Sequence, residues 1–183
     1  MHPQTLYFAY GSNLHLTQMS RRCPQSRYLG TGTLPNYKWQ INIRGYANII
    51  PSPGDYVKGL CYLLSESDEA ALDVNEGVPW AYEKVWMGVE CCAGGVRVVG
   101  RRVEEVDEVV RGWTYRGKEG EGEVVRMLVY VCRRQEEGRP RGEYVKRIGD
   151  GVVDAVKLGV EREYFEKYVE PVMMGETLEE TGS

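Results

Sequence analysis

The first half of the chain alternates short apolar runs with turn-forming residues. The apolar and aromatic run over residues 6–10 stops at Gly11-Ser12-Asn13, which predicts a first strand that runs into a tight polar turn. A short helical pattern follows over residues 14–22. Glycine, proline and asparagine then separate four strand-like segments, which cover residues 27–33, 37–43, 47–50 and 56–64.

The middle of the chain predicts one helix followed by three strands. Ser65 and Asp68 have the spacing of a capping box, and Gly77 is expected to end the helix that begins there. Glu76 therefore falls in the last helical turn. The charged, glycine-rich residues 111–123 are expected to form a solvated loop. Strands are predicted at residues 83–91, 96–103 and 124–132.

From Gly142 onward the spacing of apolar residues is helical. Side chains that fall near one face of this helix are Tyr144, Ile148, Val152, Ala155 and Val156. A second helix is predicted over residues 161–169, because Pro171 stops it.

Strands clustered first and helices clustered last predict the α+β class, as a small mixed β-sheet or barrel flanked by a few helices. The chain has 183 residues, of which 42% are hydrophobic, and this length suits a single core. We expect one domain over residues 1–174 and a flexible tail over residues 175–183.

The net charge of the chain limits the kinds of ligand that it is expected to bind. The net charge of -4 gives no broad cationic surface for phosphate backbones, so we expect a small polar ligand and no nucleic acid. No segment approaches the ~20 uninterrupted apolar residues of a membrane span, and no basic region precedes residue 6. We therefore expect a cytoplasmic protein with no membrane association. Its oligomeric state is open between monomer and homodimer.

The cysteines are odd in number and lack the C-x-x-C spacing of a zinc site. They are Cys23, Cys61, Cys91, Cys92 and Cys132. We expect reduced, structural thiols, and predict neither a metal site nor a cofactor.

The Gly11-Ser12-Asn13 turn is the first candidate for chemistry. A glycine-led turn at a strand end exposes backbone N–H groups, which can hold a carboxylate or a developing oxyanion. The alternative is an ordinary turn, since these residues are the usual turn formers.

Glu76 is the second candidate. The negative end of a helix dipole disfavours the ionised form of a carboxyl group, and Trp80 and Tyr82 nearby are expected to add desolvation. Both effects raise the pKa, which suits general acid/base catalysis. The alternative is a solvated glutamate at a helix end.

Three segments together resemble the γ-glutamylcyclotransferase family. They are F-A-Y-G-S-N-L at residues 8–14, A-N-I-I-P-S-P-G-D at 47–55 leading to V-K-G-L-C-Y at 57–62, and L-D-V-N-E-G-V at 72–78 with Tyr82 shortly after. Taken alone, residues 51–55 read as a hairpin turn without function. The resemblance covers roughly residues 6–90 and is looser beyond, where it rests on Tyr144.

The resemblance implies a cofactor-free intramolecular acyl transfer. The α-amine of a γ-glutamyl group would attack its own γ-carbonyl, giving 5-oxoproline and a released amino acid or amine. Glu76 matches the acid/base residue of the family. The matches to its substrate-binding positions are Tyr10, Gly11, Ser12, Asn13, Leu14, Tyr82 and Tyr144.

A serine hydrolase and a non-catalytic protein are the alternatives to a cyclotransferase. A serine hydrolase built on Ser12 and His15 lacks a G-x-S-x-G elbow, and the other histidine is His2. A non-catalytic γ-glutamyl-binding or interaction module is a further alternative. Within the cyclotransferase reading, Asn13 favours γ-glutamyl amino acids, while glutathione or a glutathione adduct in detoxification or secondary metabolism stays open as substrate.

Overall fold

Five strands close into a barrel in the computed structural model, which describes residues 4–95, 97–110 and 122–175. The order around the barrel is β1-β3-β2-β4-β5. Neighbours are antiparallel except β1 and β5, which close the barrel as a parallel pair. The strands are β1 (Gln4–Ala9), β2 (Arg27–Ile41), β3 (Ala47–Ser65), β4 (Glu83–Ala93) and β5 (Gly122–Val131). The predicted mixed α+β class is confirmed.

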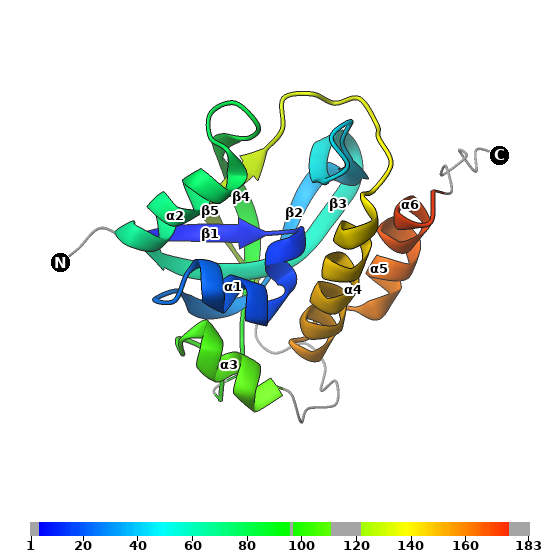
Figure 1. Ribbon diagram of the computed structural model, residues 1–183. Helices are drawn as coiled ribbons and strands as arrows, with labels where there is room; N and C mark the ends of the chain where they lie inside the picture. Colours follow the sequence, from blue (N-terminus) through cyan, green and yellow to red (C-terminus); the bar gives the residue numbers. More distant parts are fainter. Residues whose placement is uncertain (1–3, 96, 111–121, 176–183) are drawn as a thin grey trace.

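Helices pack around this barrel (Figure 1). The segment η1 and helix α1 follow β1, α2 follows β3, and α4, α5 and α6 stand together on one side. Their bounds are η1 (Ser12–Leu14), α1 (Leu16–Arg22), α2 (Glu66–Glu76), α3 (Val103–Val110), α4 (Gly142–Lys157), α5 (Arg162–Tyr168) and α6 (Glu170–Met173). Every helix in these described ranges is too short or too polar to cross a membrane.

Glycines let the barrel close tightly. A side-chain carbon on Gly59 would lie 2.0 Å from the carbonyl oxygen of Ala9, and one on Gly32 would lie 2.9 Å from the ring of Phe8. Both are shorter than any tolerated contact, so these positions require glycine. The backbone of β3 can thereby approach β1 closely, just before β1 reaches its terminal turn.

Helix α2 has the termini that its sequence predicts. The Ser65 hydroxyl accepts from the backbone N–H of Asp68 at 3.2 Å, and the Asp68 carboxylate accepts from the backbone N–H of Ser65 at 3.4 Å. Gly77 ends the helix in the left-handed conformation, at φ 66°. Glu76 is therefore the last helical residue, as expected.

Three strand predictions are wrong. The segments predicted as separate strands over residues 27–33 and 37–43 form the single strand β2. Residues 97–102 form turns and one short bridge, and α3 begins at Val103, because the spacing Val103, Val106 and Asp107 follows a helical rather than an alternating period. The chain also does not break into two strands at residues 51–55. Instead β3 continues, and residues 52–55 bulge out opposite Asn36.

The predicted helix over residues 161–169 corresponds to α5, and α6 follows it with Pro171 in its first turn, a position that proline tolerates. Of the loop predicted over 111–123, residues 111–121 lie outside the described part of the chain, and the last two belong to β5. Residues 176–183 of the predicted tail also lie outside it.

Two glycines of α4 give opposite stability predictions for the same substitution. A side-chain carbon at Gly151 would lie 2.9 Å from Cβ of Leu14 and 3.1 Å from the backbone nitrogen of His15, whereas Gly149 has open space around it. We expect Gly151→Ala to lower the free energy of unfolding by about 1–3 kcal/mol through overpacking. Gly149→Ala should raise it by roughly 0.5–1 kcal/mol, because alanine favours helix. Urea unfolding followed by circular dichroism measures both, and equal effects would contradict the close packing at Gly151.

Candidate active site

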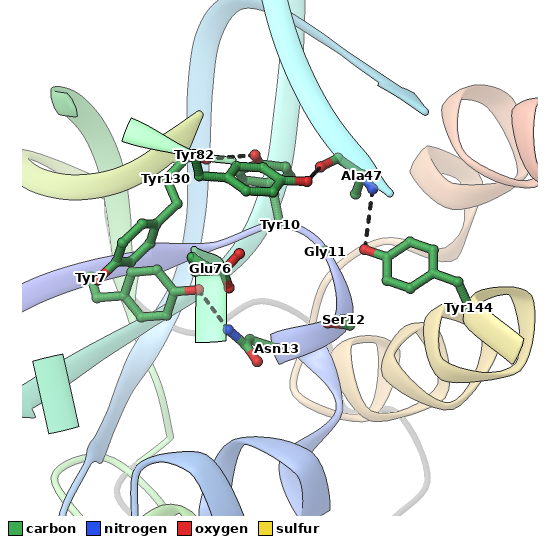
Figure 2. A pocket seen from close by; sticks show the side chains of 10 residues that line it. All are labelled: Tyr7, Tyr10, Gly11, Ser12, Asn13, Ala47, Glu76, Tyr82, Tyr130 and Tyr144. Atoms are coloured by element: carbon green, nitrogen blue, oxygen red, sulfur yellow. Dashed lines mark hydrogen bonds between the residues drawn. The ribbon is translucent and has the colours of Figure 1, made fainter. Parts of the chain in front are cut away.

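A small cavity of about 40 Å³ lies where β1 ends and the chain turns into η1. Its walls come from β1, η1, the start of β3, the end of α2, β5 and α4 (Figure 2). The lining residues are Tyr7, Tyr10, Gly11, Ser12, Asn13, Ala47, Glu76, Tyr82, Tyr130 and Tyr144. Segments from both halves of the sequence thus build one inner cavity.

The turn after β1 is held in shape by its own backbone and by its neighbours. The backbone N–H of Leu14 donates to the carbonyl of Gly11 at 3.0 Å. A side-chain carbon on Gly11 would lie 3.1 Å from both Cβ of Ala47 and the hydroxyl of Tyr144, so a larger residue would require these neighbours to shift by a few tenths of an ångström. Leu14 is buried behind the turn and does not line the inner cavity.

Asn13 fixes this turn from inside the protein. Its amide nitrogen donates to the hydroxyl of Tyr7 at 3.0 Å, and its amide oxygen accepts from Gln18 at 3.1 Å and from Arg22 at 3.0 Å. Its backbone carbonyl accepts from the hydroxyl of Tyr62 at 3.1 Å. With only 3% of its surface exposed, Asn13 is a structural anchor of the cavity wall.

The tyrosines around the cavity differ in how they use their hydroxyl hydrogens. Tyr10 donates to the carbonyl of Tyr130 at 2.6 Å, Tyr82 to the carbonyl of Ala47 at 2.7 Å, and Tyr130 to the carboxylate of Asp73 at 2.7 Å. These three hydroxyls therefore already donate their hydrogens to oxygen atoms of the protein.

Tyr7 and Tyr144 form the second group. Tyr7 accepts from the side-chain amide of Asn13 at 3.0 Å, and Tyr144 accepts from the backbone N–H of Ala47 at 3.2 Å. Because the partners named here are donors, each of these two tyrosines keeps a hydroxyl hydrogen that can point into the cavity. Burial raises the pKa of Tyr144 to about 12 and that of Tyr7 further, so both hydroxyls stay protonated.

Glu76 lies between Tyr7 and the turn after β1, with Tyr10 and Tyr82 above it in Figure 2. Burial raises the pKa of its carboxyl above the ordinary value of 4.5, and the guanidinium of Arg22 lowers it in part. Its place at the end of α2 adds the negative end of the helix dipole, which disfavours ionisation as well. The carboxyl is therefore poised for exchange of a proton.

Trp80 does not contribute to this desolvation, contrary to expectation. Its side chain is 93% exposed, because the turn after α2 carries it away from the cavity, whereas Tyr82 is buried. The desolvating surface comes instead from the tyrosines of β1, β5 and α4.

The structure brings together seven of the eight residues predicted from sequence, all except Leu14. Sequence reasoning missed Tyr7, Tyr130 and Arg22. Tyr7 could have been predicted as a site residue from the sequence, since it lies three residues before Tyr10 in the same motif. Tyr130 carried no such local signal, because only the parallel pairing of β5 with β1 brings it here.

Within the described residues, no group of three or more histidine, cysteine, aspartate or glutamate side chains is arranged to hold a metal ion. What the cavity offers is one carboxyl group shielded from water, two hydroxyl donors, and a narrow backbone turn. Groups of this kind can move a proton and stabilise a developing oxyanion.

Comparisons with known proteins identify the family of this chain. A sequence model of the family described as gamma-glutamyl cyclotransferase, AIG2-like, matches residues 7–146. Gamma-glutamylcyclotransferases from Bos taurus and Homo sapiens are each 34% identical over 83 residues, which are 40% of this chain and 44% of each relative. The match thus spans less than half the length of these relatives.

Solved structures share the fold. One described as a gamma-glutamyl cyclotransferase has a TM-score of 0.67 at 24% identity, over 99% of this chain and 93% of that one. A yeast protein described as a gamma-glutamyl cyclotransferase specific to glutathione has a TM-score of 0.51 at 13% identity, over 98% and 99% of the two chains. At these identities the likeness concerns the fold alone. Because the family model matches most of the chain, from the first to the last residue that lines the inner cavity, this protein belongs to the gamma-glutamyl cyclotransferase, AIG2-like family.

Proposed function

We propose that this protein is a γ-glutamylcyclotransferase that converts a γ-glutamyl compound to 5-oxoproline and a free amino acid or amine. The observation that carries the proposal is the Glu76 carboxyl, held away from water in a cavity beside the turn after β1. Family membership and relatives named gamma-glutamylcyclotransferase support the same reaction.

The reaction forms one carbon–nitrogen bond and breaks another. Glu76 as carboxylate takes a proton from the α-ammonium of the γ-glutamyl group, and the amine attacks the γ-carbonyl carbon. The same carboxyl then returns its proton to the leaving nitrogen as the second bond breaks, and the ring nitrogen gives up its second proton to the released amine, which departs as an ammonium. Because nucleophile and electrophile belong to one molecule, holding it folded can supply on the order of 7 kcal/mol of the barrier reduction.

The hydroxyls of Tyr7 and Tyr144 are our candidates for binding the oxyanion that forms on the γ-carbonyl. Each accepts a hydrogen bond from the protein and so keeps its own hydroxyl hydrogen for a ligand, and each lines the inner cavity with Glu76. A donor aimed at the developing charge in a water-poor site lowers the barrier more than it would in water. Tyr10, Gly11, Ser12, Asn13 and Tyr82 would shape the wall, and Leu14 would support the turn from behind.

The thiols are consistent with action in the cytoplasm. All five cysteines are unpaired, and four of them are buried. Unpaired thiols persist in a reducing compartment.

Glu76→Gln tests the assignment of the acid/base residue. The amide keeps the shape of the side chain but can neither take nor return the proton, so we expect kcat to fall by roughly 10²-fold or more. Formation of 5-oxoproline from γ-glutamyl-alanine, followed by mass spectrometry, measures this.

Glu66→Gln, an exposed position in the first turn of the same helix, is the matched control and should keep wild-type activity. The free energy of unfolding separates loss of chemistry from loss of fold. A carboxyl with a raised pKa destabilises the fold once pH exceeds its unfolded value, so Glu76→Gln should be at least as stable as wild type at pH 7. Equal turnover by Glu76→Gln and wild type would remove Glu76 from this role, and binding without turnover by wild type would favour a non-catalytic module.

The acid limb of the pH–rate profile gives a separate prediction. Because burial raises the pKa of Glu76, kcat/KM should begin to fall at a pH where an ordinary glutamate is still ionised. Arg22→Gln removes a cation that favours the carboxylate, so it should move the acid limb to higher pH. Arg22→Lys keeps the charge and should shift the limb less.

Arg21→Gln is the control for this measurement, because Arg21 is exposed and precedes Arg22 on the same helix. Its acid limb should match that of wild type. An unchanged limb in Arg22→Gln would mean that a group other than Glu76 governs the profile.

A further inference from the structure

A second, wider cavity adjoins the inner one. It has a volume of about 220 Å³, and Ser12, Glu76, Tyr82 and Tyr144 line both. The inner cavity, at about 40 Å³, is too small for a whole γ-glutamyl compound, since sites for small molecules are usually several times larger. Whatever is attached to the reacting carbonyl must therefore extend into the outer cavity.

Three arginines line the outer cavity: Arg22, which bonds Asn13, and Arg44 and Arg147, which each lie over one of a pair of aromatic rings. The rings of Tyr46 and Tyr144 meet edge to face, with centroids 5.2 Å apart. The guanidinium of Arg44 lies 5.9 Å from the ring centroid of Tyr46, and that of Arg147 lies 5.2 Å from that of Tyr144. Arg44 comes from the turn between β2 and β3 and Arg147 from α4, so the cavity gathers them from distant parts of the sequence.

The guanidinium groups of Arg44 and Arg147 are poorly neutralised. Arg147 has an acidic partner in Glu143 at 3.6 Å, but that side chain is 73% exposed, so the pair is weak. No carboxylate in residues 4–95, 97–110 and 122–175 lies within 4.0 Å of the guanidinium of Arg44. In a chain with a net charge of -4, two such cations at one cavity mark a place for an anion.

The turn that carries Arg44 is anchored to the inner cavity. The side-chain oxygen of Asn42 accepts from the backbone N–H of Arg44 at 3.0 Å, and the side-chain nitrogen of Asn42 donates to the hydroxyl of Tyr82 at 3.1 Å. The guanidinium of Arg141 in turn donates to the carbonyl of Arg44 at 3.0 Å. The position of Arg44 is thus tied to a tyrosine beside Glu76.

We propose that Arg44 and Arg147 bind the free carboxylate of the leaving part of the substrate. The enzyme would then prefer γ-glutamyl amino acids and peptides, whose leaving part is anionic, over γ-glutamylamines, whose leaving part is neutral or cationic. Guanidinium groups suit this task because they offer paired N–H donors that match the two oxygens of a carboxylate. This inference rests on the proposed cyclotransferase function and names the leaving group for it.

The test compares γ-glutamyl-alanine with γ-glutamyl-alanine amide, which differ in the charge of the leaving part and in almost nothing else. We expect wild type to prefer the carboxylate by about tenfold in kcat/KM, the usual size of one charge-assisted hydrogen bond at a partly exposed site. In the double variant Arg44→Gln, Arg147→Gln this ratio should fall toward one, chiefly through a higher KM for the carboxylate substrate. High salt should lower the wild-type ratio as well.

Lys146→Gln is the matched control for the loss of charge. Lys146 precedes Arg147 on α4, is 80% exposed, pairs with Asp150 at 2.7 Å, and lies outside both cavities. Its ratio should equal that of wild type.

The outcomes are distinguishable. If wild type turns over both substrates equally, the inference is wrong while the cyclotransferase function stands. If the double variant loses activity on both substrates in equal proportion, the arginines bind the glutamyl carboxylate or support the fold, and the inference is again wrong. If wild type turns over neither substrate, the proposed function itself fails.

Discussion

The withdrawal of one carboxyl group from water is the constraint on which the site depends. Glu76 ends α2, and the closed end of the barrel surrounds it with tyrosines from β1, β5 and α4. Burial opposes ionisation and the guanidinium of Arg22 favours it, with burial the larger effect. This balance leaves the pKa of the carboxyl above that of an ordinary glutamate, which makes it a better proton acceptor and donor than a fully solvated or a tightly ion-paired glutamate.

Asn13 shows how closely this chemistry is joined to the fold. Its side chain connects Tyr7 on β1 with Gln18 and Arg22 on α1, so the residue that shapes the turn also places the cation that moderates Glu76. The tight contacts at Gly11 and Gly59 serve the same end, because they let the turn and the strand β3 come close enough to exclude water. The same few contacts therefore determine both the shape of the turn and the electrostatic environment of Glu76.

The sequence predicted much of this arrangement because its signals are local. The apolar run that stops at Gly11 and the capping box at Ser65 placed the turn and the helix end that carries Glu76. Trp80 was misjudged because nearness in sequence does not determine which way a turn points a side chain. Tyr130 and the cationic pair of the outer cavity depend on which strands and helices become neighbours in space, and a single sequence carries no direct signal of that.

The close approach of α4 to the turn after β1 at Gly151 has a wider consequence. The strands can close into a barrel without this helix contributing any ladder hydrogen bond, yet Tyr144 and Arg147 reach the cavities only when it is seated. Because the same helix also gives Ile148, Val152 and Ala155 to the core, its seating links the packing of the protein to the completeness of both cavities. Damage at that docking contact is therefore expected to weaken the fold and to open the catalytic cavity at the same time.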